Sequence, residues 1–322
     1  MSSREWWMDF SARPAQLVLT ASVARRYYLD GKSKTDIADE LGLSRFRVAR
    51  LLEAARLGGL VRIEIINPGA IDIDLSADLQ SAFGLRHAVV VDAPGGDPGT
   101  LRQALGRAAA TLLTEIAADD DILGLAWSRA VSVMTHALVR LPAIPVVQLT
   151  GALIQPDVAD SSVDLVRHAA RVSGSAAHFF YAPAIVPDPA TARALYEQPE
   201  IARTCAMFSS VSKAVVGIGR WAAGESAVYD ATQPEARRDL HRRGVCGEIC
   251  GVLVDATGRP VESDLGRRMI GVSAAQLRAI PEVIALAYST ARSPAVQAAI
   301  RGGLIDSVVT HSSLARALLA KL

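Results

Sequence analysis

Two short amphipathic helices separated by a glycine constrain the N-terminal part of the chain more than any other feature of the sequence. Residues 35–41 and 45–57 each carry an apolar stripe with helical spacing. Gly42 suits the left-handed backbone conformation that ends a helix, and Ser44 suits the position that caps the start of the next. Ala38 is small enough for a close helix crossing. This spacing predicts two helices that meet at a steep angle, as in a helix-turn-helix.

The flanking segments complete a small unit around this pair. Residues 15–30 predict a preceding helix. Residues 58–68 alternate apolar and charged side chains, which predicts a half-exposed strand that would form a wing carrying Arg62. Asn67, Pro68 and Gly69 at its end mark a linker. We therefore expect a winged helix-turn-helix domain over residues 1–66.

The second helix of the pair exposes polar and basic side chains near its N-terminal end. That end enters the DNA major groove in proteins built on this motif, and helix N-terminal amides can hold phosphates. Residues 1–62 contain 11 Lys and Arg against 7 Asp and Glu, whereas the remainder contains 23 against 26. We therefore expect this unit to bind double-stranded DNA; a chance excess of charge and a hairpin used only for protein contacts remain as alternatives. The expected DNA-binding residues are Lys34, Thr35, Ser44, Arg45, Phe46, Arg47 and Arg50.

From residue 72 onward, segments of strand length alternate with amphipathic helices. The strand segments are continuous apolar runs, which is typical of parallel strands buried on both faces. Strands are predicted at residues 87–94, 120–126, 145–153, 177–186, 213–221 and 280–289, with a strand–turn–strand unit at 247–261. The expected fold is therefore α/β, with a doubly wound, mostly parallel sheet in a second domain over residues 72–322.

Small and polar residues follow or end several of these strands. In an open parallel sheet, ligands bind beyond the carboxyl ends of the strands. Glycines there let backbone amides approach an anion or hydroxyl groups, although any one such segment could be an ordinary turn. We expect four segments to converge on a small molecule: Gly124–Arg129, Thr150–Gly151, Gly217–Gly219 and Gly247–Glu248.

Segments throughout the chain resemble, in the same order, the SorC family of bacterial transcriptional regulators, which respond to sugars. The segments are KSKTDIADELGLSRFRVARLLEAARLGGLVRIEI, DILGLAWSRAV, VVQLTGAL, ARALYEQPEIART, AVVGIG, GVCGEICGVLVDATGRPV, GVSAAQLRAIPEVIALA and AAIRGGLIDSVVT. The resemblance spans about residues 15–320. It implies an effector domain with the fold of sugar-phosphate isomerases and glucosamine-phosphate deaminases, used for sensing rather than catalysis.

The resemblance also implies which residues hold the effector. In GLAWSRA, the family's first ligand loop, Ser128 and Ala130 stand where glycine and threonine are usual. Arg292 stands where a lysine often points at the ligand's phosphate, and an arginine could bind phosphate with two hydrogen bonds. Tyr288 replaces a small residue, and His311 replaces a common aspartate. The effector is left open between a sugar, a sugar phosphate and a polyol. The expected effector-binding residues are Gly124, Trp127, Ser128, Arg129, Thr150, Gly151, Gly219, Gly247, Glu248 and Arg292, with Glu248 the best candidate for holding hydroxyls.

An enzyme with an added N-terminal domain, such as an isomerase or deaminase, is the main alternative. It would need a placed general base and a group that polarises a carbonyl. The predicted strand ends offer no convincing trio of Asp, His and Glu, so we expect no catalytic residues and no cofactor.

Metal and membrane sites are not expected either. Cys246 and Cys250 have a spacing that could suit two metal ligands, but no further Cys or His cluster is near, so buried apolar roles are favoured. No apolar run approaches the roughly 18 residues of a membrane span, and the N-terminus lacks a signal core. We therefore expect a cytoplasmic protein that binds DNA as a homodimer or homotetramer.

Overall fold

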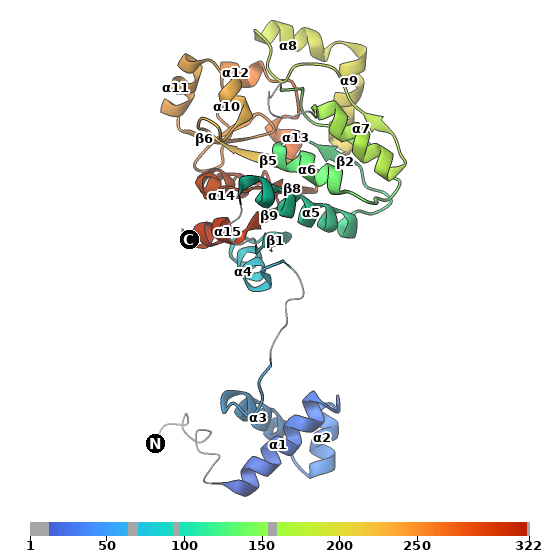
Figure 1. Cartoon of the computed structure of the whole chain (residues 1–322), viewed down its shortest axis with the longest axis vertical. Coiled ribbons are helices and arrows are strands. Elements are labelled where there is room, and N and C mark those ends of the chain that lie inside the picture. The colour runs from blue at the N-terminus through green and yellow to red at the C-terminus, as the bar shows by residue number, and fades with distance from the viewer. Residues whose placement is uncertain (1–12, 64–69, 93–96, 154–159, 321–322) are drawn as a thin grey trace. The chain divides into compact units, whose positions relative to one another are not determined.

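The computed structural model describes residues 13–63, 70–92, 97–153 and 160–320. The chain is divided into two compact units, Met1–Ile66 and Asn67–Leu322. The smaller unit is helical, and the larger one has a sheet with helices on both faces (Figure 1).

The smaller unit contains the helical pair that the sequence predicts. Its helices are α1 (Pro14–Tyr28), α2 (Lys34–Leu41) and α3 (Arg45–Leu57). Gly42 ends α2 in the left-handed region at φ 62°, and the Ser44 hydroxyl caps α3 by accepting from the Arg47 amide. The cap of α2 is Ser33, which accepts from the Asp36 amide while Asp36 accepts from Ser33. A shared core packs the three helices together: Val23, Ala24, Ile37, Ala38, Val48, Leu51, Leu52 and Ala55.

The predicted wing strand is wrong over its described part. Residues 58–63 belong to no strand. The Val61 amide donates to the Ala55 carbonyl, so it helps to end α3 instead of joining a ladder. An alternating pattern predicts which faces a segment would show, but a strand also needs a partner for its backbone groups. The rest of this prediction, with the linker at residues 67–69, lies outside the described residues.

The larger unit is built on the predicted parallel sheet. Seven strands lie in the order β1-β9-β8-β5-β2-β3-β4, with every neighbouring pair parallel. β6 pairs antiparallel with the end of β5, and β7 pairs with β6, which confirms the predicted strand–turn–strand unit. The strands are β1 (His87–Val91), β2 (Leu123–Leu125), β3 (Val146–Gln148), β4 (Ala177–His178), β5 (Lys213–Arg220), β6 (Val245–Ile249), β7 (Val252–Asp255), β8 (Glu282–Leu286) and β9 (Ser307–His311).

Successive side chains of the central strands point to opposite faces of the sheet and pack in two separate cores. Val215 packs in the core under α5, α6 and α7, whereas Val216 packs in the core under α4, α14 and α15. This is why the strands read as unbroken apolar runs. The helices are α4 (Ile73–Phe83), α5 (Pro98–Ile116), α6 (Arg129–Ala137), α7 (Ser162–Ser173), α8 (Pro189–Tyr196), α9 (Pro199–Ala206), α10 (Ala227–Ala231), α11 (Pro234–Arg242), α12 (Asp264–Arg267), α13 (Ala274–Ala279), α14 (Ser293–Arg301) and α15 (Ser312–Leu319), with 3-10 turns η1 (Met207–Ser210) and η2 (Thr290–Arg292).

The strand predicted at residues 177–186 is too long. Only Ala177 and His178 form β4, and the chain beyond makes isolated bridges through Pro183 and Ile185. Pro183 has no amide hydrogen and cannot donate to a ladder.

Among the residues that the structure describes, no helix combines the length and apolar character needed to cross a membrane.

Candidate functional site

One end of α3 presents basic and aromatic side chains to solvent. Arg45, Phe46, Arg47 and Arg50 are exposed, whereas Val48 on the opposite side is fully buried. Phe46 is 85% exposed. The helix therefore turns its predicted DNA-binding side outward and its apolar side into the core.

The other predicted DNA-binding residues lie at the starts of α2 and α3. Thr35 and Ser44 are exposed, and the Lys34 ammonium lies 5.7 Å from the centre of the Tyr27 ring. The Ser44 hydroxyl already accepts from the Arg47 amide at 3.2 Å, so this amide would have to exchange partners to hold a phosphate. Residues of α1, including Gln16 and Leu19, line a shallow groove together with Ser44, Phe46, Arg47 and Arg50.

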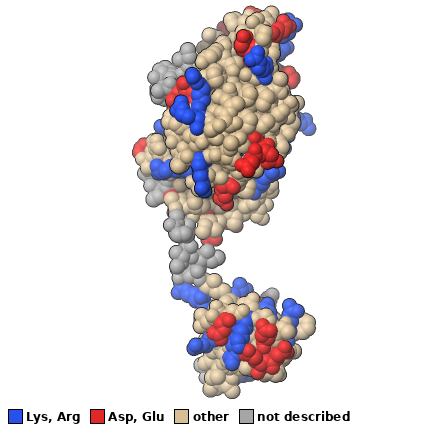
Figure 2. Space-filling view, turned by 90° about the vertical axis from the view of Figure 1, so that its right-hand side faces the viewer, with Lys and Arg blue, Asp and Glu red and all other residues tan. Residues whose placement is uncertain are grey.

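Figure 2 shows one face of the larger unit. On this face, its Lys and Arg side chains occur in small separate groups, several of them beside Asp and Glu.

A pocket opens at the carboxyl ends of β2, β3 and β8 and beside the end of β5, where it meets β6. Its empty space, counted together with the open solvent at its mouth, is about 740 Å³. Eight of the ten predicted effector-binding residues line it: Trp127, Ser128, Arg129, Thr150, Gly151, Gly219, Glu248 and Arg292.

The other two predicted residues, Gly124 and Gly247, are not among the residues that line the pocket. A Cβ on Gly124 would lie 2.9 Å from a methyl carbon of Leu149, and one on Gly247 would lie 2.5 Å from Cβ of Ala295. Both glycines therefore allow close packing inside strands β2 and β6. The sequence cannot separate such a glycine from one that faces a ligand.

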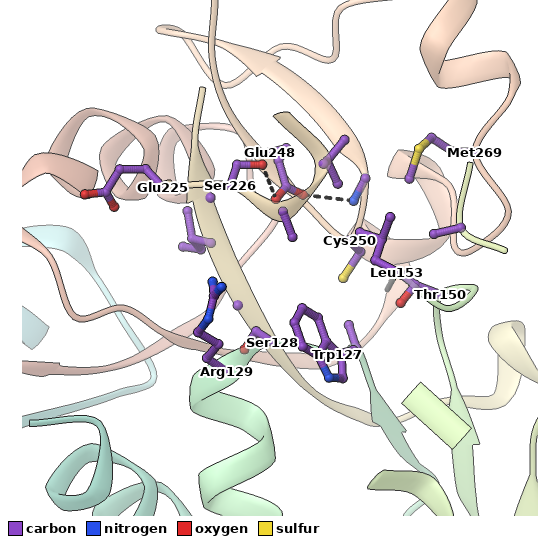
Figure 3. Close-up of a pocket in the computed structure, with 18 of the residues that line it drawn as sticks. Trp127, Ser128, Arg129, Thr150, Leu153, Glu225, Ser226, Glu248, Cys250 and Met269 are labelled. Atoms are coloured by element: carbon purple, nitrogen blue, oxygen red, sulfur yellow. Dashed lines mark hydrogen bonds between the residues drawn. The ribbon is translucent and has the colours of Figure 1, made fainter. Parts of the chain in front are cut away.

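Glu248 forms part of one wall of the pocket. Its Oε1 accepts from the Ser226 hydroxyl at 3.0 Å, and its Oε2 accepts from the Gly251 amide at 3.1 Å (Figure 3). Burial raises the pKa of this carboxyl, opposed by the hydrogen bonds from Gly251 and Ser226 and by the charge of Arg292. A carboxylate has about four acceptor positions, so two remain for ligand hydroxyls.

Gly219 lies opposite Glu248 in the β5–β6 ladder and makes room for it. A Cβ at this position would overlap Oε1 of Glu248 and lie 2.7 Å from Cβ of Ser226. Gly151 is equally constrained, since a Cβ there would lie 2.6 Å from the Pro183 carbonyl oxygen. Because these two glycines have no Cβ, the segments that form the pocket walls can lie close together.

Arg292 faces the pocket but already has an acidic partner. Its Nε donates to Oε2 of Glu225 at 2.9 Å, and the Ser289 hydroxyl donates to Oε1 of Glu225 at 3.2 Å. The guanidinium also lies 4.5 Å from the centre of the Tyr288 ring. The sequence analysis missed Glu225, because nothing in its local sequence distinguishes it from the other acidic residues of the chain.

Trp127 and Ser128 form the opposite wall, held by the loop before α7 and by the start of α6. The Trp127 indole donates to the Asp160 carbonyl at 2.8 Å. The Ser128 hydroxyl caps α6 by accepting from the Val131 amide at 3.1 Å. Figure 3 shows Trp127, Ser128 and Arg129 across the pocket from Glu248.

Apolar residues that the sequence analysis did not single out as effector-binding complete the lining. Cys250 and Gly251 form a two-residue turn between β6 and β7 with φ of 54° and 83°, and such hairpin turns favour glycine. Burial raises the pKa of the Cys250 thiol, which therefore acts as a small apolar wall near Met269 and Leu153. All three cysteines are free, and the described part of the chain holds no group of three or more His, Cys, Asp and Glu arranged for a metal ion.

His311 ends β9 and is not among the pocket-lining residues. It is buried, its Nε2 has no hydrogen-bond partner, and burial lowers its pKa. His311 therefore lies in the interior next to α15.

Comparison with known proteins extends these observations to both units. Residues 69–320 match the family of sugar-binding domains. The chain is 30% identical over 311 residues to the uncharacterized transcriptional regulator YjhU of Escherichia coli K12, which covers 91% of this chain and 92% of that protein. It is 30% identical over 313 residues to the transcriptional regulator LsrR of Klebsiella pneumoniae, and the match covers 95% of this chain and 94% of that protein.

A solved structure agrees in fold over nearly the whole chain. The full-length sorbitol operon regulator SorC from Klebsiella pneumoniae matches with a TM-score of 0.72 and 25% identity, covering 94% of this chain and 99% of that chain. The resemblance inferred from the ordered sequence segments is thereby confirmed, and the chain belongs to the SorC family of sugar-binding transcriptional regulators.

Proposed function

We propose that this regulator binds operator DNA through its N-terminal unit and controls a carbohydrate or polyol catabolic operon. A sugar, sugar phosphate or polyol held in the pocket acts as the effector. One observation carries the proposal: a single chain joins an exposed arginine-bearing helix to a pocket that is lined by the buried carboxyl group of Glu248. The relatives support it, since they include regulators named for sorbitol and deoxyribonucleosides.

DNA recognition is assigned to the exposed end of α3. Arg45 and Arg47 can each bind a guanine edge with two hydrogen bonds, and Phe46 can contact a thymine methyl group. One such helix reads one half-site, and a symmetric pair of subunits reads two. We therefore propose a homodimer or homotetramer as the DNA-binding form.

Effector recognition is assigned to the eight predicted residues that line the pocket. The effector can change the operator affinity only if it binds more tightly to one of two conformations that differ in operator affinity. The resulting coupling free energy between the two sites is typically about 1–3 kcal/mol.

The enzyme alternative has less support. Glu248, with its raised pKa, could act as a general base. However, no histidine is present among the described residues that line the pocket. The curated relatives quoted above are transcriptional regulators rather than enzymes.

The decisive experiment selects a binding sequence from random double-stranded DNA with the full-length chain and measures its affinity by fluorescence anisotropy. Each phosphate contact should contribute about −0.9 to the slope of log affinity against log salt. A sugar or polyol should then shift that affinity without being consumed. Salt-independent binding, no selected sequence, or turnover of the sugar would contradict the proposal.

A further inference from the structure

The cation that best matches a phosphate-binding role in the pocket is already neutralised. Arg292 is 8% exposed, and its Nε donates to Glu225 at 2.9 Å. Ser289 holds the other oxygen of the same carboxylate, and the Tyr288 ring lies beside the guanidinium. A phosphate would have to displace Glu225 from this arrangement or leave two anions side by side.

The other charged side chains of the pocket add no net positive charge when ionised. Among described residues lining the pocket, the charged side chains are Arg129, Arg292, Glu225 and Glu248. Their formal charges cancel when all four are ionised. A phosphate monoester brings about −1.5 to −2 charges at pH 7, and burying such a charge without full pairing is costly. Glu248, on one wall of the pocket, would be a further negative group beside the phosphate whenever it is ionised.

One amide at the start of α6 is already paired. A helix N-terminus attracts anions through its unpaired amides. Here the Ser128 hydroxyl accepts from the Val131 amide at 3.1 Å, so this amide would have to exchange partners to hold a phosphate.

By contrast, the pocket suits an uncharged molecule with several hydroxyls. Glu248 can accept hydroxyl donors, and Ser226 beside it lines the pocket. Trp127, held through its indole nitrogen, offers a ring face for the C–H side of a carbon chain or sugar ring.

We infer that the effector is an unphosphorylated sugar or polyol, and that the Glu225–Arg292 ion pair excludes the phosphorylated forms. This inference rests on the proposed function, because it assigns the class of effector for the same pocket.

The test is calorimetric titration of the full-length chain with D-glucitol, xylitol, D-ribose and D-fructose, each compared with its phosphate monoester, and with inorganic phosphate alone. At least one neutral compound should bind, about tenfold or more tighter than its phosphate ester. Glu225→Gln removes the acid that occupies Arg292 and should increase the affinity for inorganic phosphate about tenfold. Glu235→Gln, on the exposed side of α11, is the matched control and should leave both affinities unchanged.

Tighter binding of a phosphate ester than of its parent sugar would overturn the inference and leave the proposed function standing. Failure of every neutral compound to bind, or no gain in phosphate affinity in Glu225→Gln, would overturn it too. Operator binding, measured separately by anisotropy, shows whether the proposed function survives in each case.

Discussion

Replacement of Gly219 by alanine should disable the pocket by displacing Glu248. A Cβ at this position overlaps Oε1 of Glu248 and lies 2.7 Å from Cβ of Ser226. Relief requires the carboxylate to leave its hydrogen bonds to Ser226 and Gly251. Overpacking of this kind costs about 1–3 kcal/mol, which for a unit of this size lowers Tm by roughly 2–12 °C.

Scanning fluorimetry measures this loss, and calorimetry with the tightest-binding compound of the sugar and polyol panel measures the loss of affinity. Gly266→Ala is the control: its Cβ would meet only the Ser263 hydroxyl oxygen at 3.3 Å, and alanine is the better helix former. If Gly219→Ala keeps both the wild-type Tm and the wild-type affinity, the geometry assigned to Glu248 is refuted.

Three further outcomes are expected. Arg45→Ala and Arg47→Ala should each weaken operator binding by about 1–3 kcal/mol in anisotropy titrations, whereas Arg56→Ala at the far end of α3 should not; equal effects of all three would refute the recognition-helix assignment. Burial raises the folded-state pKa of Glu248 above its ordinary value of 4.5. Above this raised pKa the buried carboxylate is ionised, which lowers the free energy of unfolding. This loss of stability disappears as the pH falls through the raised pKa toward 4.5. Glu248→Gln should therefore increase the free energy of unfolding near neutral pH, by a margin that shrinks on acidification, and urea denaturation at several pH values that shows a constant margin would contradict this. Light scattering should give a multiple of the 34.0 kDa chain mass under conditions of operator binding, and a monomer with full operator affinity would exclude the symmetric pair.

The helix boundaries of the smaller unit could be predicted because each depends on a few adjacent residues. Gly42 ends α2 for lack of a Cβ, and Ser44 starts α3 by bonding an amide three residues on. The larger fold was equally accessible, since the apolar runs require a sheet covered on both faces. The wing was mispredicted because a strand depends on a partner that the local pattern does not contain.

The pocket shows where such local reasoning stops. Seven of its residues could be named because the carboxyl ends of parallel strands meet at one edge of the sheet, and Arg292 could be named from the family resemblance. The chemistry inside it comes from pairs far apart in the chain: Ser226 with Glu248, 22 positions on, and Glu225 with Arg292, 67 positions on. The sequence presents Arg292 as an unpaired cation suited to phosphate, and folding places Glu225 against it. Whether a charged residue is available to a ligand therefore depends on which distant side chain the fold brings within hydrogen-bonding distance, since electrostatic interactions act through space and not along the chain.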